Sequence, residues 1–262
     1  MATESSTISI TDLTTGYKTK RGYAEVSGHL TSSLHANQLT CMLGPNGAGK
    51  STLLRTLCGF QPQLSGSIQI MGRELESYSK SELSKLISVV LTDNSGIREM
   101  TAWDVTAMGR SPYTGFWGRL SHHDEKVIAE SLSLVGIEWL KDRKMRTLSD
   151  GECQKVMIAK ALAQETPIII LDEPTAFLDY PSKIQMMLLL KELARSLQKT
   201  IFLSTHDLEH ALQIADCIWL LDKEKGFATG TPHDLCKDGS IERYFSRKGI
   251  ELLLRKVVEG II

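Results

Sequence analysis

The chain of 262 residues lacks long hydrophobic runs. The longest, such as Ile168–Leu171 and Cys217–Leu221, fall far short of the roughly 18 apolar residues typical of a membrane span. Met1–Ser9 lacks the basic start and apolar stretch of a secretory signal. The 5 cysteines are odd in number and form no Cys-x-x-Cys pair, which argues against a disulfide framework and a zinc cluster. These absences predict a cytosolic chain with free thiols.

An excess of charge of either sign is also missing. The chain has 30 Lys and Arg against 31 Asp and Glu, a formal net charge of −1, and its basic residues are scattered. It therefore has no electrostatic footprint for general nucleic-acid binding, and we expect no nucleic-acid partner. Hydrophobic residues make up 42% and charged residues 23% of the chain, which excludes disordered and fibrous architectures.

The order of predicted elements indicates an α/β fold. Short β-rich runs come first, at Ile8–Leu13, Glu25–Leu30 and Leu39–Leu43. From about 101 to 146 the apolar spacing becomes helical, around a Gly- and Pro-rich insert at 109–118. Helices, the first of them at Glu152–Ala163, then alternate with apolar strands, which is typical of a parallel sheet. We predict a helical subdomain set into an α/β core.

A Gly-rich segment between a predicted strand and a predicted helix fits the phosphate-binding pattern Gly-x-x-x-x-Gly-Lys-Ser. Its glycines let backbone N–H groups turn toward phosphate oxygens, Lys50 reaches the β- and γ-phosphates, and Ser51 is a ligand for Mg²⁺. The alternative is a turn that merely links strand to helix. The predicted nucleotide-binding residues here are Gly44, Pro45, Asn46, Gly47, Ala48, Gly49, Lys50, Ser51 and Thr52.

Two carboxylates follow the apolar run Ile168–Leu171. A buried parallel strand would deliver Asp172 and Glu173 at its C-terminal edge, where α/β sheets bind ligands. There Asp172 can hold Mg²⁺ through its water shell, and Glu173 can orient and polarise an attacking water. The alternative, a solvated helix cap, weakens beside the phosphate-binding loop.

A third segment lies about twenty residues before Asp172 and resembles the signature of ATP-binding cassette (ABC) ATPases. Its residues are Leu148, Ser149, Asp150, Gly151 and Glu152. The resemblance extends over roughly residues 7–235, with Asp179 in the D-loop position and His206 after a β-run. It implies a P-loop NTPase core with an N-terminal antiparallel β subdomain and an inserted α-helical subdomain. The implied boundaries are 1–240 for a single ABC ATPase domain, about 93–150 for the insert and 241–262 for a C-terminal helical tail.

The same resemblance implies roles for these residues. Two subunits would form a head-to-tail homodimer with two ATP molecules at the interface. Ser149 and Gly151 of one subunit would close over the γ-phosphate bound to Lys50 of the other. Glu173 and His206 would be catalytic, with His206 contacting the γ-phosphate. Asp179 would communicate between the two sites. Tyr17 matches the aromatic residue that stacks on adenine in this family. The expected cofactors are ATP and Mg²⁺.

Two positions depart from the family pattern. Asp150 stands where the family usually has Gly, and a like-charge contact at ~6–8 Å in an effective dielectric of ~20 costs on the order of 2 kcal/mol. Unless Asp150 points outward, we expect it to weaken ATP-driven closure. Thr92 replaces a Gln that usually contacts Mg²⁺ and faces the transporter, so a metal contact from Thr92 needs a bridging water.

A rival motif, the His-x-x-Glu-His of inverted zinc proteases, occurs at 206–210. That chemistry requires both histidines on one helix face and a third ligand. His206 instead lies two residues after the end of the β-run Ile201–Ser204, so we expect it at a strand end.

The physiological task is inferred from what accompanies the ATPase motifs. The chain has one phosphate-binding loop, one signature and no membrane span. Members of the resembled family that act in translation or DNA repair usually carry paired cassettes or long coiled-coil insertions, which this sequence lacks, so the resemblance implies a separate membrane subunit. Met108–Tyr113 resembles the helical subdomain of importers for iron–siderophore, haem or cobalamin. Such importers pair two ATPase subunits with two permease subunits and an extracytoplasmic substrate-binding protein, which predicts peripheral attachment at the cytoplasmic face of the inner membrane. The alternatives are an ATPase subunit of a different ABC transporter and a soluble, non-transport ABC ATPase.

Overall fold

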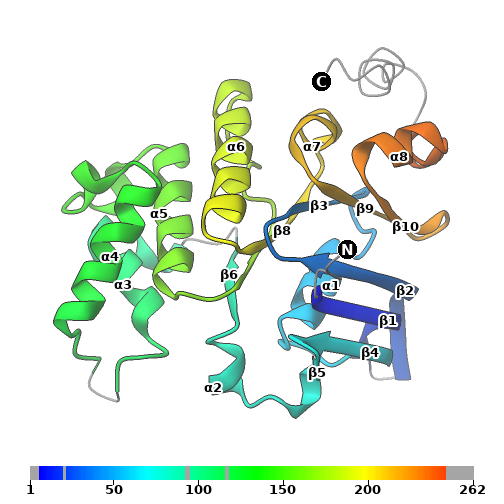
Figure 1. Ribbon diagram of the computed structural model, residues 1–262, viewed down its shortest axis with the longest axis horizontal. Coiled ribbons are helices and arrows are strands. Elements are labelled where there is room, and N and C mark those ends of the chain that lie inside the picture. The colour runs from blue at the N-terminus through cyan, green and yellow to red at the C-terminus, as the bar shows by residue number, and fades with distance from the viewer. Residues whose placement is uncertain (1–5, 20–21, 92–94, 116–117, 246–262) are drawn as a thin grey trace.

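The computed structural model describes residues 6–19, 22–91, 95–115 and 118–245. Thr92, and 246–262 of the predicted helical tail, lie outside these residues. Two sheets and a group of helices make up the described fold (Figure 1). No helix within it is long and apolar enough to cross a membrane.

The larger sheet is parallel except at one edge. Its six strands, in spatial order, are β10 (Gly226–Gly230), β9 (Cys217–Asp222), β3 (Leu39–Leu43), β8 (Thr200–Thr205), β7 (Ile168–Leu171) and β6 (Ile87–Val90). Only the β10–β9 pair is antiparallel. The predicted bounds of β3 and β7 are confirmed, because each is an uninterrupted, fully buried apolar run between turn residues.

Side chains alternate between the two faces of this sheet, as the pleat of a strand requires. In β7, Ile169 and Leu171 belong to the core that faces α5 and α6, whereas Ile168 and Ile170 belong to the core shared with α1 and the smaller sheet. The parallel sheet is therefore covered on both faces.

The smaller sheet is antiparallel and lies against α1. Its order is β2 (Gly22–His35), β1 (Ser6–Thr19), β4 (Ser65–Ile70) and β5 (Arg73–Glu74). The predicted antiparallel N-terminal subdomain is confirmed, but β1 and β2 each have 14 residues and extend well beyond the predicted runs. Register shifts between these strands, one of them beside Asp12 at φ 47°, interrupt the regular alternation that a sequence pattern would reveal.

Three α-helices, two inside the predicted insert and one that begins at its boundary at residue 150, form a group that stands apart from the antiparallel sheet across the parallel sheet in Figure 1. They are α3 (Ala102–Ala107), α4 (His122–Leu134) and α5 (Asp150–Ala163). Each begins at a capping box in which a Ser or Thr and an acidic residue three positions later exchange hydrogen bonds: Thr101 with Asp104, Ser121 with Asp124 and Ser149 with Glu152. The predicted start of α5 at Glu152 was two residues late, because the cap is Ser149.

The remaining elements connect and cover the sheets. The α-helices are α1 (Lys50–Leu57), α2 (Lys80–Leu83), α6 (Tyr180–Ser196), α7 (Leu208–Ile214), α8 (Pro232–Lys237) and α9 (Ser240–Tyr244). The 3₁₀ helices are η1 (Leu75–Ser77), η2 (Ser95–Ile97), η3 (Met108–Arg110), η4 (Glu138–Leu140) and η5 (Met145–Thr147). Helix α9 spans the predicted boundary at residue 240 and buries Ile241 and Tyr244 in the larger core. The described start of the predicted tail is therefore packed on the domain.

Candidate functional site

The phosphate-binding loop connects β3 to α1, as predicted. Gly49 is the N-cap of α1 at φ 105°, a left-handed conformation that a residue with a Cβ adopts only at a cost. No side chain caps this helix, so its first backbone N–H groups are available to an anion. Lys50 is only 6% exposed, and its Nζ donates to the carbonyl oxygens of Gly44 at 2.8 Å and Pro45 at 3.3 Å.

An open cavity of about 330 Å³ brings most of the predicted nucleotide residues together. It is lined by Tyr17, Val26, Asn46, Gly47, Gly49, Lys50, Ser51, Thr52, Glu173 and Lys223. Tyr17 reaches it from β1 in the antiparallel sheet, while the loop and Glu173 reach it from the edge of the parallel sheet. Gly44, Pro45 and Ala48 shape the loop but do not line this cavity.

The electrostatics of the cavity are set by Lys50 and the two carboxylates. Burial lowers the pKa of the Lys50 ammonium, and the charges of Glu173 and Asp172 oppose that shift. Lys223 adds a second cation to the lining. Sequence reasoning missed Lys223, although its place directly after β9, beside the strand that leads into the loop, could have indicated it.

Asp172 and Glu173 follow β7 at the C-terminal edge of the sheet, as predicted. Ser204, at the end of β8, connects them: its Oγ donates to Asp172 Oδ1 at 2.6 Å and accepts from the backbone N of Glu173 at 2.9 Å. Glu173 has φ 47°, an uncommon conformation for a residue other than Gly. Sequence reasoning missed Ser204, because it lies in β8 whereas its hydrogen-bond partners Asp172 and Glu173 follow β7.

Residues that could hold Mg²⁺ meet beside this carboxylate pair. Ser51 and Asp172 line a common narrow space next to the nucleotide cavity. A hydroxyl and a carboxylate are hard oxygen donors of the kind that Mg²⁺ prefers, so the donor set fits the ion. The third predicted contact, Thr92, lies outside the described residues.

The two histidines of the rival zinc motif lie in different surroundings. His206 follows β8 directly, as predicted, and its Nδ1 is 4.0 Å from Glu173 Oε2. His210 is buried on α7, with its Nδ1 2.7 Å from Asp207 Oδ2. The described part of the chain contains no group of three His, Cys, Asp or Glu residues that could hold a metal ion. His206 thus belongs to the carboxylate site.

The signature lies on a different surface from the phosphate-binding loop. Leu148 and Asp150 line a separate cavity of about 320 Å³, together with Arg98, Arg146 and neighbouring residues. Ser149 caps α5: its Oγ accepts from the Glu152 N at 3.3 Å and donates to Glu152 Oε2 at 2.9 Å. One chain therefore does not bring its signature to its own nucleotide cavity.

Asp150 and Asp179 both stand at helix starts. Asp150 is exposed in the first turn of α5, where the helix dipole favours a negative charge. Asp179 caps α6, and the hydrogen bonds that its carboxylate accepts from Ser182 lower its pKa. Phe177, in the same loop, is 75% exposed.

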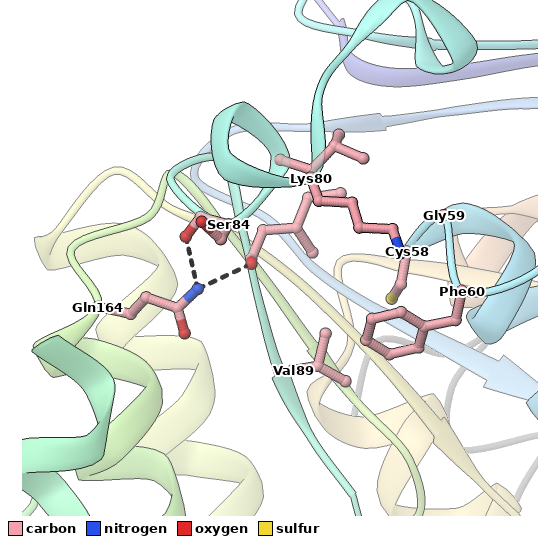
Figure 2. A pocket seen from close by; sticks show the side chains of 9 residues that line it. Cys58, Gly59, Phe60, Lys80, Ser84, Val89 and Gln164 are labelled. Carbon is pink, nitrogen blue, oxygen red and sulfur yellow. Dashed lines mark hydrogen bonds between the residues drawn. The ribbon is translucent and has the colours of Figure 1, made fainter. Parts of the chain in front are cut away.

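A larger cavity of about 510 Å³ lies between the core and the C-terminal end of α5 (Figure 2). Gln164 closes one side of it, and Phe60 and Lys80 lie on the opposite side. The lining is completed by Cys58, Gly59, Leu83, Ser84, Ile87 and Val89. These residues come from three distant parts of the chain, and no sequence motif predicted that they would form a cavity.

Comparisons with known proteins agree with this geometry. The ABC transporter family model matches residues 28–176. The ABC transporter ATP-binding protein MJ0873 of Methanocaldococcus jannaschii is 40% identical over 90% of this chain and 80% of its own length. The ferric enterobactin transport ATP-binding protein FepC of Escherichia coli is 34% identical over 89% of this chain and 84% of its own length. A solved metal-chelate type ABC transporter in an inward-facing conformation is 28% identical, with a TM-score of 0.79 over 92% of this chain and 89% of that chain.

Proposed function

The chain belongs to the ABC transporter family, and on that premise we propose that it is the ATPase subunit of a membrane importer for an iron–siderophore complex. The observation that carries the proposal is the separation of two ATP-handling surfaces, one holding the phosphate-binding loop with Glu173 and the other the signature. Each chain is thus built to be completed by a second copy. The ferric enterobactin relative favours an iron chelate over haem or cobalamin, which the likeness of the insert leaves open.

The nucleotide cavity supports hydrolysis of ATP by in-line attack of water. Tyr17 stacks on the adenine, and Lys50 and the α1 N–H groups bind the phosphates. Glu173 accepts a proton from the attacking water as the bond between the γ-phosphorus and the bridging oxygen breaks, which releases ADP and phosphate. His206 contacts the γ-phosphate. Ser51 and Asp172 would hold Mg²⁺, which neutralises phosphate charge when bound.

Two copies act together in this proposal. In a head-to-tail homodimer, Ser149 and Gly151 of one subunit meet the γ-phosphate bound by Lys50 of the other, and Asp179 lies between the two sites. Exposure of Ser149 and Phe177 in the single chain supports such an interface. Closure over ATP then alternates with opening after hydrolysis, and two permease subunits use that motion.

The cavity in Figure 2 is our proposed contact with the permease at the cytoplasmic face of the membrane. Phe60 at its side is 61% exposed, so an apolar segment of a partner would bury it. Cys58, Phe60 and Val89 also line the narrow space that contains Ser51 and Asp172. A segment seated there would therefore contact side chains that also line the space of the proposed Mg²⁺ ligands. An extracytoplasmic binding protein would deliver the substrate.

Affinity purification from solubilised membranes, followed by transport in proteoliposomes, tests this function. We expect the tagged chain to bring down a permease with many membrane spans and to drive ATP-dependent uptake of ferric enterobactin in preference to haem or cobalamin. The Lys50→Ala variant is the control and should support no uptake. Recovery without any permease would favour the non-transport ATPase, and uptake of an unrelated substrate would favour a different ABC transporter.

A further inference from the structure

Helix α5 connects the two surfaces to which the proposed function assigns partners. It begins beside Ser149 of the signature and ends at Ala163, next to Gln164 on the wall of the cavity in Figure 2. Its 14 residues correspond to a length of about 21 Å. A small rotation about one end therefore displaces the other end appreciably.

The insert holds the C-terminal end of α5 through Arg110. This guanidinium is 2% exposed, and its Nη1 donates to the Ala163 carbonyl oxygen at 2.7 Å and to Glu165 Oε2 at 2.6 Å. Its Nε donates to Asp124 Oδ1 at 2.8 Å. The Ala163 carbonyl is one of the last-turn acceptors that a helix leaves unpaired, so Arg110 both satisfies and anchors it.

Two neighbours of Arg110 strengthen this anchor. The Tyr113 hydroxyl donates to the Gln164 carbonyl oxygen at 3.0 Å, and the Tyr113 ring centroid lies 4.2 Å from Arg110 Cζ. Gly109 packs so closely that a Cβ there would collide with the Lys160 carbonyl oxygen in α5. The insert thus grips the last turn of α5 at several backbone positions.

Besides the apolar packing of α5 on the core, the Gln164 side chain ties the same end of the helix to the core by hydrogen bonds. Gln164 Nε2 donates to the carbonyl oxygens of Ser84 at 2.6 Å and Ile87 at 3.1 Å, as the dashed lines in Figure 2 show. Ser84 is the C-cap of α2 and Ile87 begins β6, so these bonds join the end of α5 to α2 and to the parallel sheet. The same bonds form part of the cavity wall.

We propose that Gln164 is a positioning residue that makes the C-terminal end of α5 a pivot and thereby aims the signature at the nucleotide of the partner subunit. The inference rests on the proposed function. With this end held from both sides, a movement of the cavity wall turns α5 and shifts Ser149. Without the Gln164 bonds, the orientation of α5 broadens, and more conformational entropy is lost when Ser149 docks.

The test measures dimerisation separately from nucleotide binding, in full chains that carry Glu173→Gln. ADP affinity of the monomer reports the phosphate-binding loop alone, whereas the ATP concentration at half-maximal dimerisation reports the signature in trans. Gln164→Met keeps the side-chain length but removes both donors. We expect unchanged ADP affinity and a rise in the required ATP of roughly 3- to 10-fold, as expected for loss of one to two net hydrogen bonds.

Gln69→Met is the matched control, because it removes an amide whose hydrogen bond to Glu74 lies in the antiparallel sheet. It should leave both measurements unchanged. Equal dimerisation of the Gln164→Met variant and the reference would overturn the inference, as would a parallel loss of ADP affinity. If Gln164→Met does not fold, Tyr113→Phe decides by the same comparison, with an expected rise of roughly 2- to 3-fold. If the reference chain, which carries only Glu173→Gln, does not dimerise with ATP, the proposed function is overturned as well.

Discussion

Lys50 shows how a single buried cation is prepared for an anionic substrate. Burial disfavours its charge, and the carboxylates of Asp172 and Glu173 only partly compensate. Its hydrogen bonds go to the carbonyl oxygens of its own loop, which hold the ammonium in place without neutralising it. A phosphate chain would supply the missing negative charge, so nucleotide binding and Lys50 ionisation should support each other.

Lys50→Ala removes the cation that is aimed at the β- and γ-phosphates, and we expect ATP affinity to fall roughly 100-fold, because charge-assisted hydrogen bonds from a buried ammonium are strong. Calorimetric titration with Mg·ATP measures it. Lys225→Ala is a suitable control, because the Lys225 ammonium donates instead to the Tyr244 carbonyl oxygen. Near-normal affinity in Lys50→Ala would show that the loop does not bind phosphate.

Asp150 provides a test of charge repulsion at dimer closure. If its carboxylate faces the incoming phosphates, repulsion on the order of 1–2 kcal/mol weakens closure by roughly 5- to 30-fold. Asp150→Gly should then lower the ATP needed for dimerisation, and Asp150→Asn should recover much of that gain, most clearly at low salt. Sedimentation at two salt concentrations measures it. Equal behaviour of Asp150→Asn and the unmodified chain at low salt would mean that Arg98, Arg146 or the helix dipole already offsets the charge.

Helix starts could have been predicted more closely from the sequence than they were, whereas the full extent of long antiparallel strands could not. The boxes at Ser121 and Ser149 follow a local rule of four residues, which sequence alone contains. Strands β1 and β2 instead depend on pairing across shifted registers, which a local pattern does not encode. The parallel strands were predictable because burial on both faces makes them uniformly apolar.

Ser149→Ala and Ser121→Ala form a matched pair that separates capping from signature chemistry. Each removes a capping box, so each should lower the free energy of unfolding by about 1 kcal/mol. Only Ser149→Ala should also raise the ATP needed for dimerisation, because only α5 begins at the signature. Denaturant unfolding and sedimentation of both variants provide the comparison. A similar dimerisation defect in Ser121→Ala would attribute the effect to stability of the insert.

In the described part of the chain, three surfaces lie around the parallel sheet. They are the nucleotide cavity, the signature cavity and the cavity beside Gln164. Sequence motifs predicted the nucleotide surface and the signature surface, because each follows from contiguous residues. The cavity beside Gln164 was not predictable, since Phe60, Lys80 and Gln164 come from separate parts of the chain and meet only in the folded structure. Ser204 was missed for a similar reason, as its contacts join the ends of β7 and β8, which helix α6 separates in the sequence.

ATP-dependent dimerisation of the Glu173→Gln variant tests the central claim most directly. The amide keeps the shape of the side chain but accepts a proton poorly, so ATP should bind while hydrolysis is almost abolished. Size-exclusion chromatography with light scattering should show a monomer without nucleotide and a stable dimer with Mg·ATP. The Lys50→Ala/Glu173→Gln double variant should remain a monomer. A Glu173→Gln chain that hydrolyses ATP at the normal rate, or stays monomeric under saturating Mg·ATP, would contradict the account.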